Sequence, residues 1–310
     1  MRSFYTSFCA MALIVAGTSA YGQAFVSSTG NDANACTEAA PCLTFQRALT
    51  QTVNFGSITC LNTGQYSSST LTITQSVTID CHDGNSGRMD LSSSGTIAIN
   101  ITASSAVHVT LRHLSLVGTS GSSGVVTTGF PPGSSLGIQE SYIEGFGGAG
   151  FGVSFTPTGS GRSSLSISST SLSGNGVAVF VAPPSGQIAS VLFSSCGMGG
   201  STTDGLDLAG AGVTAGVMRG CTVASNNGNG FVGSSAGGVF FTIEESTFSA
   251  NLGVGIETNS ASANVDVAAS TIGGNGTGIK SLSGSLTSFG DNHISANGVN
   301  GTFTSTIPLQ

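Results

Sequence analysis

A short motif recurs about every 25 residues through the second half of this 310-residue chain. Each copy has an apolar residue, a small polar residue or cysteine three positions later, and a second apolar residue two positions after that. A repeat at this period is typical of proteins that stack one structural unit per repeat. The small polar position is held by Ser141, Thr170, Cys196, Cys221, Ser246, Ser270 and Asn292.

The spacing inside one repeat predicts short strands joined by bends. Residues two apart in a strand point to the same side, so a step of three indicates a bend. Five residues after the small polar position, five of the seven repeats have Asn, as at Asn226 and Asn251. Asn tolerates left-handed backbone conformations, which predicts a second bend there. A Gly and an apolar residue, such as Gly205 and Leu206, then start a third strand.

We therefore predict an all-β fold, a right-handed parallel β-helix of about ten three-strand coils. Because parallel strands lie about 4.8 Å apart, the stack would be about 50 Å long. The 47 glycines and 7% charged residues would also suit a disordered chain, but the positive mean hydropathy of +0.29 and the ordered aliphatic spacing oppose that. Leucine-rich repeats, calcium-binding nonapeptide repeats and β-propellers lack support, because their signature residues are missing.

Residues 1–24 are interpreted as a signal peptide. Arg2 precedes an apolar run over 8–17, and small residues offer cleavage sites that end at Ala20 or Ala24. The run is shorter than the about 20 residues that span a bilayer. We expect a secreted or periplasmic protein with no membrane insertion after cleavage.

The rest of the chain is assigned to two parts. Residues 25–57 would form an N-terminal segment with a helix over 43–53, and residues 58–310 the parallel β-helix domain. The helix would place Phe45, Ala48, Leu49 and Val53 on one face and cover the open end of the stack. Residues 301–310 are expected to close the other end.

Six of the seven cysteines remain after signal removal, and an even number in an exported protein favours disulfides. Neighbouring coils lie within the roughly 4.4–6.8 Å that disulfides need between Cα atoms. Buried free thiols, acting as small apolar groups, are the alternative. The candidate pairs are Cys36 with Cys42, Cys60 with Cys81, and Cys196 with Cys221.

The start of the predicted mature chain resembles a known group. The segments AFVSSTGNDANACTEAAPCLTFQRAL, ITCLNTGQY and SVTIDC are similar to the start of exported bacterial right-handed parallel β-helix repeat proteins, within the pectin lyase-like superfamily. The resemblance implies a fold and a compartment. It implies no particular reaction, because that group has no assigned activity.

Enzymes of this superfamily suggest where catalytic residues would lie. Its lyases use a carboxylate cluster for calcium and a basic residue, and its polygalacturonases use paired carboxylates. The segment Thr203–Asp207 resembles the first polygalacturonase motif, but the three motifs that follow it in those enzymes are missing here. Asp204 and Asp207 are therefore candidates for catalysis, with ordinary turn residues of the repeat as the simpler interpretation.

The repeat also predicts which residues are neighbours. Asp207, Val232, Glu257 and Lys280 occupy one register position, so they should line one outward face on successive coils. Asp207 and Glu257 would lie two coils or about 10 Å apart, slightly beyond the about 6.5–9.5 Å of inverting glycosidases. Glu257 and Lys280 join the candidate catalytic residues, and a solvated face is the simpler interpretation.

Two other charged groups stand out. Arg219 and Glu244 share a register position, which predicts a surface ion pair. Around a polar loop lie residues that offer a site for a cation or a sugar, or simply a polar surface: Asp80, His82, Asp83, Arg88 and Asp90. No metal site is predicted, because the histidines do not cluster with cysteines at zinc-site spacing.

These observations lead to two functional hypotheses. The first is a non-catalytic exported β-helix protein that binds glycans or partners, or has a structural role. The alternative is a pectin lyase-like polysaccharide lyase or glycoside hydrolase. We expect no cofactor, with calcium only in the case of a lyase. The net charge of −7 and pI of about 4.8 oppose nucleic acid as a partner, and polysaccharide is the expected ligand class.

Overall fold

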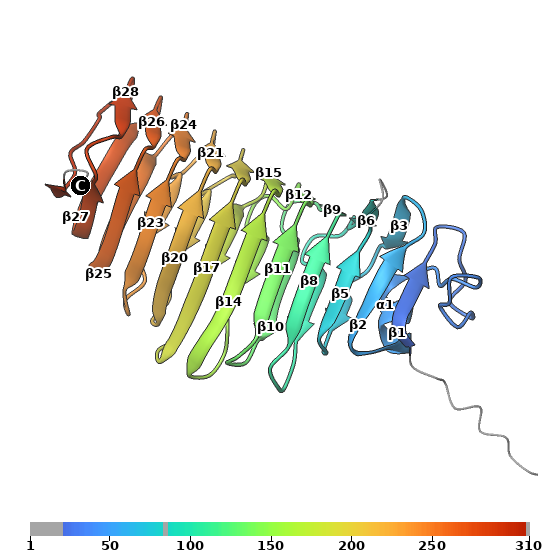
Figure 1. Ribbon diagram of the computed structural model, residues 1–310. Helices are drawn as coiled ribbons and strands as arrows, with labels where there is room; N and C mark the ends of the chain where they lie inside the picture. The colour runs from blue at the N-terminus through green and yellow to red at the C-terminus, as the bar shows by residue number, and fades with distance from the viewer. Residues whose placement is uncertain (1–20, 83–85, 308–310) are drawn as a thin grey trace, which may run out of the picture.

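The computed structural model describes residues 21–82 and 86–307, so the predicted signal-peptide core and Asp83 lie outside the described residues. The described chain forms a right-handed parallel β-helix, an elongated stack with its first coil at β1 (Tyr21–Val26) and its last at β27 (Thr277–Ser288) and β28 (His293–Ser295) (Figure 1). The predicted fold class is confirmed.

Each regular coil contributes one strand to each of three faces. The long-strand face contains β2 (Thr52–Cys60), β5 (Val77–Asp80), β8 (His108–Arg112), β11 (Ser135–Gln139), β14 (Gly161–Ser168), β17 (Gln187–Ser194), β20 (Val213–Arg219) and β23 (Val239–Glu244). The short-strand face is a 10-stranded sheet of β3 (Gly64–Ser67), β6 (Gly87–Asp90), β9 (Leu114–Val117), β12 (Tyr142–Glu144), β15 (Ser171–Ser173), β18 (Gly197–Gly199), β21 (Thr222–Ala224), β24 (Thr247–Ser249), β26 (Thr271–Gly273) and β28.

Strand β1 pairs with β2 on the long-strand face, and most of the other strands form the third face. It contains β4 (Leu71–Ile73), β7 (Ile97–Thr102), β10 (Ser123–Gly129), β13 (Phe151–Phe155), β16 (Val177–Val181), β19 (Leu206–Leu208) and β22 (Phe231–Gly233). At the C-terminal end, β25 (Val254–Ala268) and β27 run without interruption from the third face into the long-strand face. The short strand β29 (Ser305–Thr306) pairs with the end of β27.

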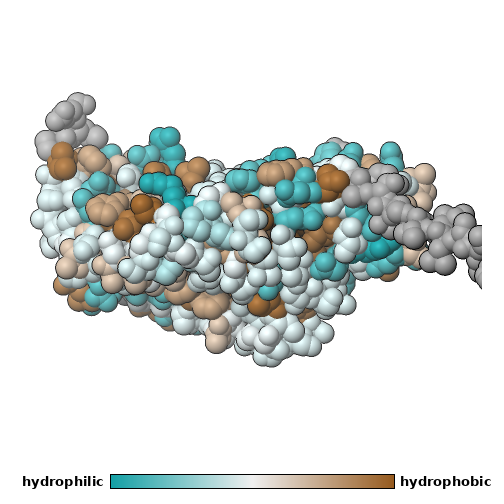
Figure 2. All heavy atoms as spheres, turned by 90° about the horizontal axis from the view of Figure 1, so that it is seen from below, coloured by the Kyte–Doolittle hydropathy of each residue, from teal (hydrophilic) through white to brown (hydrophobic). Residues whose placement is uncertain are grey.

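The register between coils is the one that the repeat predicts. On the short-strand face, Ile143 faces Leu172, Leu172 faces Met198, and Met198 faces Val223. These side chains are 0–1% exposed. The core is therefore a set of ladders of apolar side chains, each buried by the coils above and below it. Most residues on the side seen in Figure 2 have near-neutral hydropathy, with small apolar and hydrophilic groups between them.

The small polar residue of the motif joins coils at the first bend. Glu245 has a left-handed backbone (φ 49°), and the next residue, Ser246, turns its hydroxyl inward. That hydroxyl donates to the carbonyl of Glu244 (2.7 Å) and accepts the Cys221 N–H of the preceding coil (3.2 Å). The N–H of Ser246 in turn donates to the hydroxyl of Ser270 on the next coil (3.2 Å). The side chain thus satisfies backbone groups that the bend would leave unpaired.

The asparagines of the motif form a second, buried ladder. The Asn251 side-chain amide donates to the carbonyl of Val223 (3.2 Å) and to Oδ1 of Asn275 (2.8 Å). Its own Oδ1 accepts from the side chain and from the N–H of Asn226 (2.9 and 3.2 Å). Asn251 therefore bonds to both neighbouring coils, to Val223 and Asn226 on the preceding coil and to Asn275 on the next.

This ladder corrects the prediction that the asparagines themselves turn the chain through a left-handed conformation. The left-handed residue is the one before each ladder position, and the asparagines are not left-handed. The left-handed residues are Gly174, Gly200, Ser225, Ala250, Gly274 and Ala296. Asn occurs at this position because its side chain can donate and accept at once.

The predicted capping helix is present but shorter. Helix α1 spans Phe45–Gln51 and buries Phe45, Ala48 and Leu49 against the first coils, at the end drawn in blue in Figure 1. Val53 was expected on the same face. Instead it lies in strand β2 and is 38% exposed, because the chain leaves the helix at Thr52. No helix in the described ranges is long and apolar enough to cross a bilayer.

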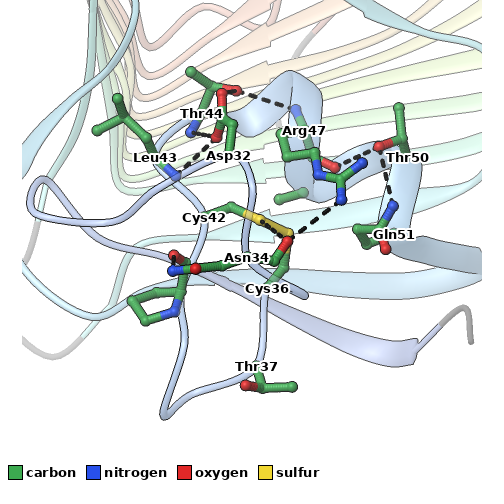
Figure 3. Close-up of a disulfide and its surroundings, with 12 residues drawn as sticks. Asp32, Asn34, Cys36, Thr37, Cys42, Leu43, Thr44, Arg47, Thr50 and Gln51 are labelled. Carbon is green, nitrogen blue, oxygen red and sulfur yellow. Dashed lines mark hydrogen bonds between the residues drawn. A yellow bond between two sulfur atoms is a disulfide. The ribbon is translucent and has the colours of Figure 1, made fainter. Parts of the chain in front are cut away.

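A disulfide holds the loop that leads into this helix (Figure 3). Cys36 and Cys42 are bonded, and the carbonyl of Asn34 accepts from Arg47 (3.4 Å). Asp32 accepts the N–H of Thr44 (2.9 Å), while the Thr44 hydroxyl accepts the Arg47 N–H and so caps the helix. The loop and helix together cover the first coil.

The second predicted bridge, Cys60–Cys81, also joins neighbouring coils. The third is absent. Cys196 and Cys221 are buried free thiols, each beside the carbonyl two residues earlier (3.3 and 3.4 Å). They occupy the small polar position, and Cys221 Sγ accepts the Cys196 N–H (3.3 Å). They act as members of the hydrogen-bonded ladder, as serine does in other coils.

Replacing one ladder asparagine should destabilise the stack. Asn251→Ala removes four side-chain hydrogen bonds and leaves buried groups unpaired, so we expect a loss of about 2–4 kcal/mol. Asn264→Ala is the matched control, because Asn264 is exposed and should change stability by less than about 0.5 kcal/mol. Urea unfolding followed by circular dichroism measures both. Equal effects of the two substitutions would contradict the ladder's role.

Thiol counting tests the cysteine assignment. The native protein should react with no equivalents of a thiol reagent, because Cys196 and Cys221 are buried. After denaturation without reductant, two thiols should react, and peptide mapping should place both at these positions. Absence of any reactive thiol after denaturation would show that the two cysteines are bridged after all.

Candidate functional site

The candidate catalytic residues lie on the outward side of the third face. Asp207, Val232, Glu257 and Lys280 follow one another on successive coils in one column, as the repeat predicts. Phe180 precedes Asp207 in this column. The inward neighbours of these residues are buried, so alternation along each strand turns the column outward. Asp204 lies just before β19 on the same side.

Asp207 is the most perturbed titratable group of this column. It stands between Phe180 and Val232 on the neighbouring coils and is partly buried. Burial raises the pKa of its carboxyl to about 6, and the nearby Asp204 charge adds to that effect. A carboxyl with a pKa in this range is suited to exchange protons or to form hydrogen bonds in either protonation state.

Asp204 also has a structural role, because it joins two neighbouring coils. Its Oδ1 accepts the backbone N–H of Asn229 on the next coil (2.6 Å). Burial raises the pKa of Asp204, and this hydrogen bond opposes the rise. Asn229 repeats the contact, because its side chain accepts the N–H of Val254 (2.7 Å). Asp204 thus belongs to a cross-coil ladder, which agrees with its interpretation as a repeat residue.

An aromatic pair lies beside Asp207 and was not singled out from the sequence. The rings of Phe151 and Phe180 are 5.1 Å apart, on β13 and β16, and both residues are partly exposed. Phe180 faces Asp207 in the strand register. The strand register pairs Phe151 with Val177 and Phe180 with Ser154, so the repeat alone does not place the two rings side by side.

Glu257 and Lys280 lie further along the column. From Asp207, Glu257 is two coils away and Lys280 is three, or about 10 Å and 14 Å. The structure brings Asp204 and Asp207 onto one surface, and it places the other two candidates at the C-terminal end of the same face.

A second charged cluster spans three coils at the first bend. The ring of His113 lies between two carboxylates, with Nδ1 2.8 Å from Asp80 and Nε2 3.0 Å from Glu140. Arg112 contacts the same two carboxylates at 3.3 and 3.5 Å, and His82 approaches Asp80 at 3.9 Å. The strand register explains the cluster, because Asp80 and Arg112 are paired neighbours.

Of the residues that the sequence grouped with Asp80, His82 lies near it (3.9 Å), and Asp83 lies outside the described residues. Arg88 instead pairs with Asp90 on the same strand (2.6 Å), away from Asp80. The predicted pair of Arg219 and Glu244 is present (3.5 Å), and Glu245 joins it (3.2 Å). All these pairs are substantially exposed, so solvent screens them and their effect on stability is small. Within residues 21–82 and 86–307, no group of three His, Cys, Asp or Glu side chains has the arrangement of a metal site.

Because the pKa of Asp207 is raised, replacing Asp207 by a neutral residue should change the stability of the protein in a pH-dependent way. Between about pH 4 and pH 6 the folded protein holds this proton more tightly than the unfolded chain, so stability falls as the pH rises through that window. Asp207→Asn removes the penalty and should stabilise the protein above pH 6, on the order of 1–2 kcal/mol. The gain should vanish near pH 4. Thermal unfolding at several pH values measures it, and a gain that is independent of pH would contradict the assignment.

Comparison with known proteins supports the fold and leaves the activity open. No protein-family model matches the sequence, and no curated protein matches it. Among solved structures, pectate lyase Pel9A matches 92% of this chain and 78% of its own, with 16% identity and a TM-score of 0.54. The Dettilon tailspike protein matches 81% of this chain and 50% of its own (14% identity, TM-score 0.52).

A third solved structure has the same architecture. The A-module of the mannuronan C-5 epimerase AlgE6 from Azotobacter vinelandii matches 75% of this chain and 67% of its own, with 16% identity and a TM-score of 0.51. Identities this low establish a common architecture only. The chain therefore has the same parallel β-helix architecture as these three proteins.

Proposed function

We propose that this is an exported, non-catalytic glycan-binding protein, and that the outward side of its third face is the binding surface. The observation that carries the proposal is the partly exposed Phe151–Phe180 pair, of which Phe180 is in register with Asp207 on the next coil. Aromatic rings supply an apolar platform, and a neighbouring carboxyl fixes a ligand by hydrogen bonds. Structurally similar proteins include a pectate lyase and an epimerase that acts on mannuronan, which supports a glycan as the ligand class.

The absence of a complete catalytic group on this face supports the non-catalytic part. Asp204 is engaged by the Asn229 backbone. Glu257 lies about 10 Å from Asp207 along the stack, slightly beyond the about 6.5–9.5 Å between the carboxyls of inverting glycosidases, and Lys280 lies about 14 Å away. An acid and a base that act on one bond must both reach it.

One observation favours the alternative, a polysaccharide lyase or hydrolase. Asp207 has a pKa of about 6 and lies beside Asp204, and pairs of carboxyls in unlike environments serve as acid and base in glycosidases. The two functions differ in a simple outcome, which is the breakdown of a bound polysaccharide.

Export is part of the proposal, and the position of the first strand bears on where the signal peptide is cleaved. Strand β1 begins at Tyr21, and its Ala24 is fully buried and paired with Ile58. Cleavage after Ala24 would remove most of this strand, whereas cleavage after Ala20 would leave it intact. The disulfides Cys36–Cys42 and Cys60–Cys81 suit an oxidising compartment.

N-terminal sequencing of the protein secreted by a bacterial host tests this point. We expect the mature chain to begin at Tyr21, because the β1 pairing would then be complete. A mature chain that begins at Phe25 would contradict the role of β1, and an unprocessed chain in the cytoplasm would contradict export.

A binding screen tests the main proposal. The mature protein is titrated with neutral and acidic oligosaccharides, with and without calcium, and each mixture is assayed for cleavage products. We expect binding without turnover, and Phe180→Ala should weaken binding about tenfold, because it removes half of the platform. Tyr142→Ala is the matched control on the short-strand face, since Tyr142 is exposed there.

Two results of this screen would contradict the proposal. Turnover that is lost in Asp204→Ala or Asp207→Ala would establish the enzymatic alternative. Equal loss of binding in Phe180→Ala and Tyr142→Ala would show that the third face is not the binding surface.

A further inference from the structure

A cavity of about 460 Å³ lies at the C-terminal end of the third face. One wall is formed by Thr277, Lys280 and Ser281 of β27, and the opposite wall by Thr302 and Phe303 of the segment that follows β28. Its volume is within the range of small-molecule sites, about 300–1,000 Å³. The cavity offers one cation, several hydroxyl groups and one aromatic wall.

The path of the backbone creates this cavity. The C-terminal segment pairs with β27 at Ile279, whose N–H donates to the Asn300 carbonyl (3.0 Å), and again at Leu286, whose carbonyl accepts the Thr304 N–H (2.8 Å). Between these points the chain turns away at Gly301, which has φ +76°. A side chain there would bring its Cβ within 1.9 Å of the Ile279 carbonyl, so the turn requires glycine.

Lys280 is the single lysine of the chain, and its side chain is exposed at this cavity. Within the part of the chain that the structure describes, no carboxylate lies within 4.0 Å of its ammonium, although Glu257 is its register neighbour. The cations Arg88, Arg112 and Arg219 are all engaged in ion pairs. Lys280 therefore remains free to pair with an anionic group.

The charges nearby limit how many negative groups a ligand can bring. Next to Lys280 on the column comes Glu257, and beyond it Asp207, with Asp204 beside it. A polyanion laid along this face would meet these carboxylates and be repelled, as the net charge of −7 also requires. A ligand with a single negative group can place it at Lys280 and extend a neutral chain over the rest of the face.

We propose that the cavity binds one anionic group, a carboxylate or a sulfate or phosphate ester, carried at the end of an otherwise neutral glycan. The Lys280 ammonium pairs with this group, Thr302 donates a hydrogen bond to one of its oxygens, and Phe303 packs on the sugar ring. The glycan part of this inference rests on the proposed function. The anion site itself does not rest on the proposed function, because the cavity and its lysine are present whether or not a glycan binds to the third face.

The single lysine provides a direct readout. The mature protein is treated with an acetylating reagent, and peptide mass spectrometry separates acetylation of Lys280 from that of the N-terminal amine. The probes are inorganic phosphate, galacturonic acid, a neutral oligosaccharide, the same oligosaccharide ended by one uronate, and polygalacturonate. Calorimetry measures affinity for each probe in parallel.

We expect the uronate-ended oligosaccharide to bind about tenfold more tightly than its neutral counterpart and to slow acetylation of Lys280. Lys280→Gln should abolish this gain, and Lys280→Arg should retain it. Arg162→Gln is the matched control, because Arg162 is an exposed cation on the long-strand face that bonds only to Ser190 within the described chain. It should leave the gain unchanged.

Three results would overturn the inference. The first is a gain that persists in Lys280→Gln. The second is polygalacturonate that binds more tightly than the singly charged oligosaccharide. The third is inorganic phosphate that protects Lys280 as well as the uronate-ended chain does, which indicates a site for free anions. If galacturonic acid protects Lys280 while no oligosaccharide binds, the proposed function fails and the anion site stands.

Discussion

Each bend of this protein depends on hydrogen bonds that the neighbouring coils supply. At a bend, backbone groups leave the strand pattern and would be buried without partners. The inward hydroxyls, thiols and carboxamides of successive coils bind those groups, as Ser246 does for Cys221 and Asn251 for Asn226. A coil is thus incomplete without its neighbours, and the fold is stable only as a stack. The capping helix and its disulfide loop cover the first coil for the same reason.

Because the inward side chains supply the hydrogen bonds that join the coils, the outward side chains are free to vary. Serine, threonine and glycine hold most outward positions. Where another residue type occurs, the strand register tells which residue of the next coil lies beside it. Phe180 and Asp207 become neighbours in this way, although 27 residues separate them. The same register places Glu257 about 10 Å and Lys280 about 14 Å from Asp207 along the stack, and this spacing is the reason for proposing that the face binds a ligand without cleaving it.

The period of the motif was enough to predict the coil, the apolar ladders and the outward column, because strand pairing in a stack follows the repeat directly. It did not reveal the conformation of the asparagines, since either a left-handed turn residue or a hydrogen-bonding side chain explains Asn near a bend. Cys196 and Cys221 were similarly ambiguous. A disulfide and a hydrogen-bonded ladder of free thiols both require the two residues to lie next to each other on neighbouring coils. The His113 cluster was missed since the first coils depart from the 25-residue spacing. Its signal was present, because Asp80 and Arg112 each follow a buried aliphatic residue at the same motif position. The cavity at Lys280 depends on the path of the C-terminal segment, which no periodicity describes.

Hydroxyl-radical footprinting of the mature protein with a bound oligosaccharide tests the central claim most directly. The account predicts that Phe151 and Phe180 are protected from oxidation by the ligand, while Tyr142 on the short-strand face and Phe240 on the long-strand face, both exposed in the free protein, remain unchanged. Protection of Tyr142 or Phe240, with Phe151 and Phe180 unaffected, would contradict it.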